Sequence, residues 1–153
     1  PPPPPFFFFT PTPASALLRS LVGSEMCIRD SPSTIPNAIS AAVSNIARQL
    51  DAGAIIPLTK SGSTARNVSK FRPPTPILAT TTERSVARRL QLVWGVQPIK
   101  VDNYDNVDSI PSLCNKILDQ VKVIDKKDQF VITGGVPMGI AGTTNYLSIQ
   151  VYN

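Results

Sequence analysis

The spacing of apolar runs places the strongest constraint on what this chain can fold into. Four short runs, 54–58, 76–80, 96–101 and 129–133, are separated by segments in which apolar residues recur three or four positions apart. Strands that alternate with helices form right-handed βαβ units, and such units build a largely parallel sheet. A fifth run, 146–151, follows the fourth without an intervening helix, so we expect it to pair antiparallel.

The segments between these runs have the apolar spacing of helices that cover a sheet. They are 37–50, 65–71, 83–94 and 110–123, and each carries its apolar residues largely on one face. Gly53 is predicted to end the first of them. The fold class predicted from this pattern is α/β: a three-layer sandwich with a mostly parallel five-stranded sheet, one antiparallel strand and flanking helices.

The first 31 residues differ in composition from the rest. They open with five prolines and four phenylalanines, which is low-complexity sequence that is not expected to pack into a domain. The stretch 17–31 is similar to a string that recurs as translated adaptor sequence in unrelated proteins. We therefore expect 1–31 to be an unstructured or artefactual extension and 32–153 to form the domain. A proline-rich ligand for an SH3-type partner and a secretory signal peptide are weaker interpretations.

Residue content excludes several kinds of site. The chain has no histidine, which removes the commonest general base and the commonest metal ligand. Cys27 and Cys114 are too far apart for a zinc site, and Cys114 is predicted to be a small core residue. Trp94 is predicted to pack beside Gly95. No apolar run approaches the ~20 residues of a membrane span. We expect no metal site, no membrane association and a cytoplasmic protein.

The charge balance favours a small anionic ligand over a nucleic acid. The net charge is +5, but the basic residues are scattered, and no aromatic residues alternate with them as a stacking platform would require. We therefore predict no nucleic-acid partner.

A polar turn at 59–64 is the candidate binding element. It follows an apolar strand and precedes a helix, and it offers four hydroxyls, one ammonium group and one glycine. Backbone N–H groups at a helix N-terminus favour a phosphate, although the same residues also serve as ordinary helix caps. The glycine-rich loop 134–145 follows a strand of the same parallel sheet. Ligands bind beyond the carboxyl ends of such strands, so both loops are predicted to meet there, which favours the phosphate site.

With these motifs in place, the chain resembles the C-terminal domain of pyruvate kinase. The resemblance covers 32–153, and its motifs occur in the family's order. The runs that carry it are 58–66, 68–73, 76–79, 87–96, 131–139 and 142–145.

The resemblance implies a domain of an enzyme that transfers phosphate from phosphoenolpyruvate to ADP in the last step of glycolysis. In that family, catalysis belongs to a (β/α)8 barrel that uses Mg²⁺ and K⁺. This chain is therefore expected to hold no catalytic residue and no cofactor, and to be inactive alone. The resemblance further implies an allosteric effector, contacts with the enzyme's own barrel and a place in a homotetramer.

Residue by residue, the resemblance assigns two binding elements. An arginine that bisphosphate-regulated members place before the last helix is replaced here by 109–111, with Lys116 as the nearest base. This departure disfavours a bisphosphate effector and leaves a sugar phosphate, a nucleoside monophosphate or no effector open. The phosphate turn is Thr59, Lys60, Ser61, Gly62, Ser63 and Thr64, and the effector loop contains Gly134, Gly135, Val136, Pro137, Gly139, Gly142 and Thr143.

Two other functions compete with this interpretation. One is a ligand-free structural or oligomerisation module, in which the turn only caps its helix and the contacts come from 83–94 and the last strand. The other is an independent phosphatase or kinase, which the lack of histidine, of clustered carboxylates and of a serine–base pair disfavours.

Overall fold

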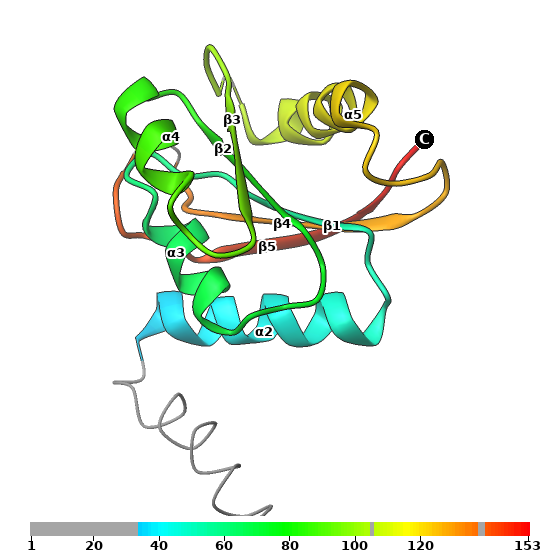
Figure 1. Ribbon diagram of the computed structural model, residues 1–153, viewed down its shortest axis with the longest axis horizontal. Helices are drawn as coiled ribbons and strands as arrows, with labels where there is room; N and C mark the ends of the chain where they lie inside the picture. Colours follow the sequence, from blue (N-terminus) through cyan, green and yellow to red (C-terminus); the bar gives the residue numbers. More distant parts are fainter. Residues whose placement is uncertain (1–33, 105, 138–139) are drawn as a thin grey trace, which may run out of the picture. The chain divides into compact units, whose positions relative to one another are not determined.

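The computed structural model describes residues 34–104, 106–137 and 140–153 (Figure 1). The predicted extension 1–31 lies outside the described residues, and so does Gly139 of the predicted effector loop.

The described chain alternates helices and strands in the predicted order. The elements are α2 (Ile35–Gln49), β1 (Ala54–Pro57), α3 (Ser63–Lys70), β2 (Ile77–Thr81), α4 (Arg84–Leu90), β3 (Val96–Lys100), the 3₁₀ turn η1 (Val107–Ser109), α5 (Ile110–Val121), β4 (Gln129–Gly134) and β5 (Tyr146–Val151).

The five strands form one sheet with the order β3-β2-β1-β4-β5. The first four strands are parallel, and β5 pairs antiparallel with β4. Ile55 of β1 lies opposite Ile77 of β2 and Val131 of β4, so β1 is the central strand. The predicted α/β fold with one antiparallel strand is confirmed. Because the chain runs outward from β1 to β3 and then returns to β4, the strand order reverses at β1, which is where open α/β sheets form ligand sites.

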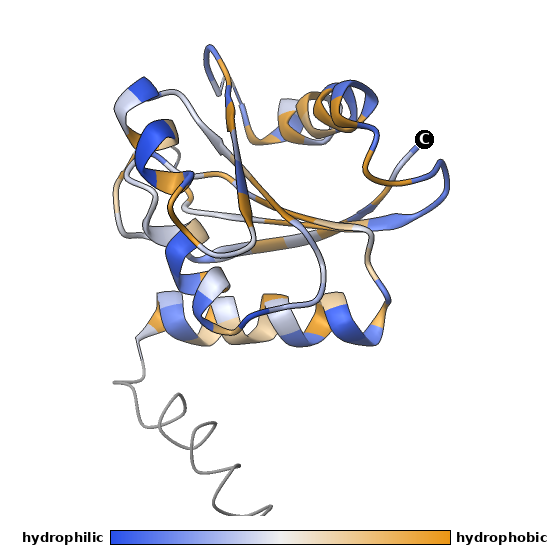
Figure 2. Cartoon of the chain, viewed as in Figure 1, coloured by the Kyte–Doolittle hydropathy of each residue, from blue (hydrophilic) through white to orange (hydrophobic). Residues whose placement is uncertain are grey.

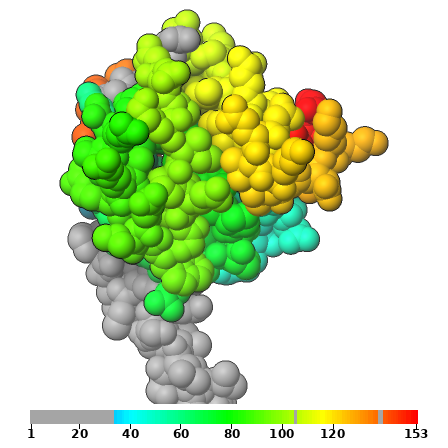
Figure 3. Space-filling view, turned by 45° about the horizontal axis from the view of Figure 1, so that its top comes forward, coloured from blue at the N-terminus to red at the C-terminus, as the bar shows by residue number. Residues whose placement is uncertain are grey.

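One face of the sheet packs against α5 and the connection that precedes it (Figure 1). Ile56, Leu78 and Phe130 point to this face and are almost completely buried. They belong to the same apolar cluster as Cys114 and Leu118 of α5, which confirms Cys114 as a core residue. Figure 3 shows α5, in yellow, beside the green to yellow-green segment that contains α4 and β3.

The opposite face packs against α2, α3 and α4. Ile55, Ile77 and Val131 alternate with the residues of the first face and meet Val43 and Ala47 of α2. Figure 2 shows that α2 and α5 each carry both orange, hydrophobic residues and blue, hydrophilic ones. A third cluster joins α3 and α4 to β2 through Ala65, Ala79, Val86 and Leu90.

The end of α2 differs from the prediction. The helix ends at Gln49, and Asp51 carries the left-handed backbone conformation, with φ 49°, in place of Gly53. The structure requires a glycine at position 53 for another reason, because a Cβ there would lie 2.4 Å from the Ile124 side chain. The glycine therefore allows the start of β1 to approach the segment after α5.

The end of α4 is also a correction. The helix stops at Leu90, and the residues up to Gly95 form turns rather than the predicted continuation to Trp94. Trp94 does not pack inward beside Gly95. Its side chain is 52% exposed, and the Arg72 guanidinium lies 5.7 Å from the ring centroid, a cation–π arrangement at the surface.

Candidate functional site

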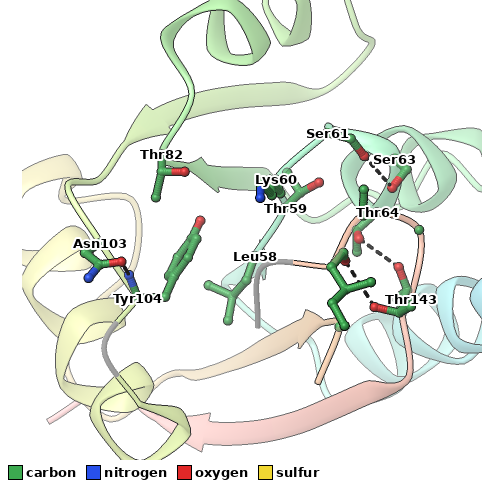
Figure 4. Close-up of a pocket in the computed structure, with 15 residues that line it drawn as sticks. Leu58, Thr59, Lys60, Ser61, Ser63, Thr64, Thr82, Asn103, Tyr104 and Thr143 are labelled. Atoms are coloured by element: carbon green, nitrogen blue, oxygen red, sulfur yellow. Dashed lines mark hydrogen bonds between the residues drawn. The ribbon is translucent and has the colours of Figure 1, made fainter. Parts of the chain in front are cut away.

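The carboxyl ends of the parallel strands surround a cavity of about 220 Å³ (Figure 4). The turn after β1 lies on one side, the connections after β2 and β3 lie on another, and the loop between β4 and β5 closes the third. The predicted meeting of the two loops at one edge of the sheet is therefore confirmed. The lining residues are Leu58, Thr59, Lys60, Ser61, Ser63, Thr64, Thr82, Asn103, Tyr104, Gly135, Ile140, Ala141, Gly142, Thr143 and Thr144.

The turn after β1 is held by its own hydrogen bonds. Gly62 has φ 84°, a conformation that glycine adopts without a Cβ penalty, and its N–H donates to the Thr59 hydroxyl at 2.8 Å. The Ser61 hydroxyl donates to that of Ser63 at 3.1 Å. The helix α3 begins at Ser63, so its first free N–H groups lie beside these hydroxyls. The turn is thus both a helix start and a cluster of hydrogen-bond donors at the cavity.

The loop between β4 and β5 is closed by Asn145. Its side-chain amide donates to the Val136 carbonyl and its side-chain oxygen accepts from the Val136 N–H, both at 2.8 Å. Its backbone N–H donates to the Gly134 carbonyl at 3.0 Å. Gly135 faces the returning segment so closely that a Cβ would lie 2.5 Å from the Thr143 carbonyl oxygen. These contacts fix the distance between the two arms of the loop.

A buried hydrogen bond joins the turn to the loop. The hydroxyls of Thr64 in α3 and Thr144 in the loop lie 2.7 Å apart, and both residues are almost fully buried. A polar pair in such a position must stay paired, because an unsatisfied buried hydroxyl costs about 1–3 kcal/mol. This hydrogen bond therefore holds the turn and the loop together.

Most residues predicted for the site reach the cavity. Gly62 shapes the turn without lining the cavity, and Gly134, Val136 and Pro137 belong to the loop but not to the lining. Gly139 lies outside the described residues. The predicted residues that do line the cavity are Thr59, Lys60, Ser61, Ser63, Thr64, Gly135, Gly142 and Thr143.

The residues after β2 and β3 were missed at the sequence level. Thr82, Asn103 and Tyr104 line the cavity because both strands end at the same edge as β1. The parallel strand order would have placed them there. The Tyr104 hydroxyl donates to the Thr80 hydroxyl at 3.1 Å and also bonds with the backbone of Thr59. Its ring is thereby fixed between the ends of β1 and β2.

Charge at the cavity is concentrated at one end. Lys60 is the only charged residue among the described lining residues, and it is exposed. The Arg66 guanidinium lies next to the same turn, 3.3 Å from where a Cβ on Gly62 would be. Among the described residues, the cavity lining and Arg66 thus place positive charge beside the turn, and the rest of the lining is uncharged.

The described residues contain no group of three or more acidic, cysteine or histidine side chains that could hold a metal ion. The donor set at the cavity, with hydroxyls, backbone N–H groups and one ammonium, suits an anion and not the oxygen-rich coordination of Mg²⁺. Within the described part of the chain, no helix is long and apolar enough to cross a membrane.

Burial raises the pKa of the Tyr104 hydroxyl from 10.0 to about 12, against the lowering effect of its hydrogen bond to Thr80. The unfolded chain therefore loses this proton near pH 10 while the folded chain keeps it. The stabilisation of the folded state that results from this pKa difference is fully present below pH 10. About 3 kcal/mol of the free energy of unfolding is lost as the pH rises from 10 to 12. We expect urea midpoints of Tyr104→Phe to fall less between pH 9.5 and 11.5 than those of the unaltered chain. Parallel pH profiles of the two proteins would contradict the assignment of this pH dependence to Tyr104.

The fold and the cavity define a doubly wound α/β domain with a hydroxyl-lined cleft at the strand-order reversal. Residues 37–150 match the family model described as pyruvate kinase, alpha/beta domain. The chain therefore belongs to the pyruvate kinase family, and it corresponds to the C-terminal domain of these enzymes.

Individual relatives agree with this assignment. The chain is 46% identical over 121 residues to pyruvate kinase 2 of Synechocystis sp., covering 79% of this chain and 20% of that protein. It is 41% identical over 115 residues to the pyruvate kinase of Clostridium acetobutylicum, covering 75% and 24% respectively. The structure of Cryptosporidium parvum pyruvate kinase in complex with ADP matches with a TM-score of 0.74 at 26% identity, covering 90% of this chain and 27% of that chain. The chain thus spans about a fifth to a quarter of the length of its curated relatives.

Proposed function

We propose that this chain is the regulatory domain of a pyruvate kinase and that it binds a phosphorylated allosteric effector. One observation carries the proposal: the turn at 59–64 and the loop between β4 and β5 share a single cavity. Each element carries a sequence feature of an anion-binding loop: hydroxyls and a glycine in the turn, and several glycines in the loop.

The chemistry of the turn supports a phosphate at this end of the cavity. Ser61 and Ser63 supply hydroxyl donors, and the start of α3 supplies backbone N–H groups and the positive end of the helix dipole. Lys60 supplies a compact charge at the rim. Charge-assisted hydrogen bonds of this kind are roughly twice as strong as neutral ones.

The rest of the enzyme follows from the family. The parent protein would transfer phosphate from phosphoenolpyruvate to ADP in glycolysis, in the cytoplasm, with Mg²⁺ and K⁺ held by a barrel outside this chain. The domain would act by contacting its own barrel and by contributing a face to a homotetramer. The described residues offer no place for these metals, so no catalytic step is assigned to them.

Lys60→Glu is expected to weaken the binding of inorganic phosphate and of sugar phosphates by about 10–100-fold, because a charge-assisted contact worth about 1.5–3 kcal/mol is replaced by repulsion. Isothermal titration calorimetry of the 153-residue chain measures this directly. The matched control is Lys70→Glu, which makes the same charge change at the far end of α3, about 10 Å along the helix. Equal losses in both variants would mean that net charge, and not the site, attracts the anion.

One observation favours an additional role in assembly. β5 is an edge strand, and Ile149 and Val151 on it are 43% and 44% exposed. An edge with exposed apolar residues readily pairs with another chain. This supports the proposed tetramer contacts, and it also fits a domain that serves assembly without any ligand.

A further inference from the structure

We propose that the surface formed by α4, by the turns after it and by the end of α3 is a docking site for an acidic segment of a separate protein. The segment would carry several carboxylates and a large apolar side chain. The surface, which we call the arginine patch, consists of Arg72, Arg84, Arg88, Arg89, Leu92 and Trp94. None of these residues lines the cavity, so the proposal does not depend on an effector site there.

Positive charge is concentrated in the part of the chain that builds this surface. Between Lys60 and Trp94 there are seven basic residues and one acidic residue, Glu83, which gives this segment a net charge of +6. The whole chain carries +5, so the remaining residues together are slightly acidic. The basic residues are spread along the sequence, but α3 and α4 lie side by side and gather them on one layer of the fold (Figure 1). Figure 2 shows blue, hydrophilic stretches on both helices.

The arginines of the patch are all exposed and lack an anionic partner. Within the described part of the chain, Lys100 pairs with Asp102, but no guanidinium group of the patch forms an ion pair or a hydrogen bond. Arg84 and Arg88 are four positions apart on α4, so their side chains leave the same face about 6 Å apart along the helix. Like charges at this spacing repel each other, and a bound carboxylate between them relieves the repulsion.

An apolar contact surface adjoins the arginines. Leu92 is almost fully exposed, and about half of the Trp94 side chain is exposed. The Arg72 guanidinium lies over the Trp94 ring, and the Trp94 carbonyl accepts a 2.6 Å hydrogen bond from the Ser69 hydroxyl of α3. These contacts hold the turn after α4 against the end of α3 before any partner binds. Tryptophan and arginine are enriched in binding hot spots, and a preorganised pair loses little entropy on binding.

The patch suits the carboxylates of a protein better than a nucleic acid. Guanidinium groups bind a carboxylate through two parallel hydrogen bonds. A single-stranded nucleic acid would need several aromatic faces for successive bases, whereas the patch offers the ring of Trp94 alone, and Arg72 lies over one side of it. Leu92 adds an aliphatic contact that an apolar side chain can cover. An acidic protein segment with one large apolar residue therefore complements the whole patch.

A second copy of this chain is a poorer occupant. A dimer with two-fold symmetry brings the same surface of both copies together. Arginines of one patch would then face arginines of the other, and such like-charge contacts suppress association. A separate acidic partner meets the same arginines with opposite charge, so charge complementarity favours it over self-association.

Trp94 is the only tryptophan of the chain, so its fluorescence reports directly on the patch. The probe is a synthetic peptide of about twelve residues, or about three helical turns, made of glutamate and aspartate with leucine at two positions. It is titrated into the 153-residue chain at about 0.15 M salt, where the Debye length is about 8 Å. We expect saturable binding with a dissociation constant on the order of micromolar, and a blue shift of the Trp94 emission as the indole leaves water.

Two further probes test the chemistry of the partner. The same peptide with every carboxylate replaced by an amide is expected to bind at least about tenfold more weakly, and so is an oligothymidylate of the same length. If the oligothymidylate binds as tightly as the acidic peptide, the patch is a nucleic-acid surface and the proposal is wrong. It is also wrong if the amide peptide binds equally well, or if the acidic peptide leaves the Trp94 emission unchanged, since it then binds elsewhere.

Variants with matched charge locate the binding. Arg84→Glu with Arg88→Glu is expected to weaken the acidic peptide by at least about tenfold. The control, Lys116→Glu with Lys126→Glu, makes the same charge change at exposed positions on α5 and in the connection after it, and is expected to change affinity by less than about twofold. Leu92→Ala keeps all charges and is expected to weaken the peptide by about threefold. Equal losses in the two double variants would overturn the proposal.

Sedimentation of the same proteins tests for a second copy as the occupant. We expect the unaltered chain and the variant Arg84→Glu with Arg88→Glu to sediment alike at every concentration, because the patch does not bind itself. Self-association that this double variant abolishes would identify a second copy as the occupant and overturn the proposal.

Discussion

Replacing Phe130 with alanine is expected to lower the free energy of unfolding by about 3–5 kcal/mol. Phe130 is among the largest fully buried side chains of the domain and lies on β4. It is paired across the sheet with Ala54 of β1 and Gln150 of β5, and it belongs to the cluster that contains Leu118 of α5. Removing the ring leaves a cavity between β4 and α5. We expect the backbone of these elements to be too constrained by the sheet to close this cavity. Urea unfolding followed by circular dichroism measures the loss.

The control is a second apolar residue without a core environment. Leu92 is 90% exposed in the turn after α4, so Leu92→Ala is expected to change the free energy of unfolding by less than about 0.5 kcal/mol. A loss below about 2 kcal/mol for Phe130→Ala would mean that α5 shifts to fill the space, and that the layer on this face is less rigid than its burial indicates.

The order of elements was predictable from the sequence because the signals for it are local. The apolar run of β4 around Val131 and the helical spacing of α5 around Leu118 indicate their structures without any knowledge of neighbours. The antiparallel pairing of β5 followed from the short connection, which has no room for a crossover helix. The confirmed fold class thus depends on patterns within helices and strands of only 4–15 residues each.

The ends of the helices were not predictable to the same degree, because distant contacts decide them. A glycine at position 53 is typical of a helix terminator. Gly53 is needed instead because a Cβ there would overlap the side chain of Ile124, about seventy residues further along the chain. A tryptophan is typical of a protein core. However, α4 ends at Leu90, and the turns that follow place the Trp94 indole at the surface, next to Arg72. Sequence alone does not show which of several plausible roles a glycine or a tryptophan takes.

The residues of the site fall into the same two groups, those with a local sequence signal and those placed by distant contacts. The turn at 59–64 is recognisable in the sequence by its hydroxyls and glycine, and the loop between β4 and β5 is recognisable by its glycines. Tyr104 and Thr144 lack such a signature, since a lone tyrosine or threonine in a polar connection is ordinary. Their roles arise from long-range hydrogen bonds, to Thr80 and Thr64 respectively, which only the assembled sheet creates.

The second large effect is expected at Gly135, where substitution should act on the binding site more than on the core. In Gly135→Ala the new Cβ would lie 2.5 Å from the carbonyl oxygen and 2.6 Å from the hydroxyl of Thr143. The φ angle of Gly135 is not positive, so the effect is steric overlap alone. Overpacking of this kind costs about 1–3 kcal/mol, and the backbone oxygen cannot move without separating the two arms of the loop. Phosphate-ester affinity is therefore expected to fall by at least about tenfold, as calorimetry would measure.

The comparison that isolates this mechanism is Gly95→Ala. Gly95 has φ 67°, so an alanine there strains the backbone by about 1–2 kcal/mol, but a Cβ would meet no atom within 4 Å and Gly95 does not line the cavity. The two variants should therefore lose similar stability, while only Gly135→Ala loses ligand. Full affinity in Gly135→Ala would show that the ligand does not need the two arms held at this distance. The separation set by Gly135 and the Asn145 hydrogen bonds would then be a feature of folding rather than of recognition.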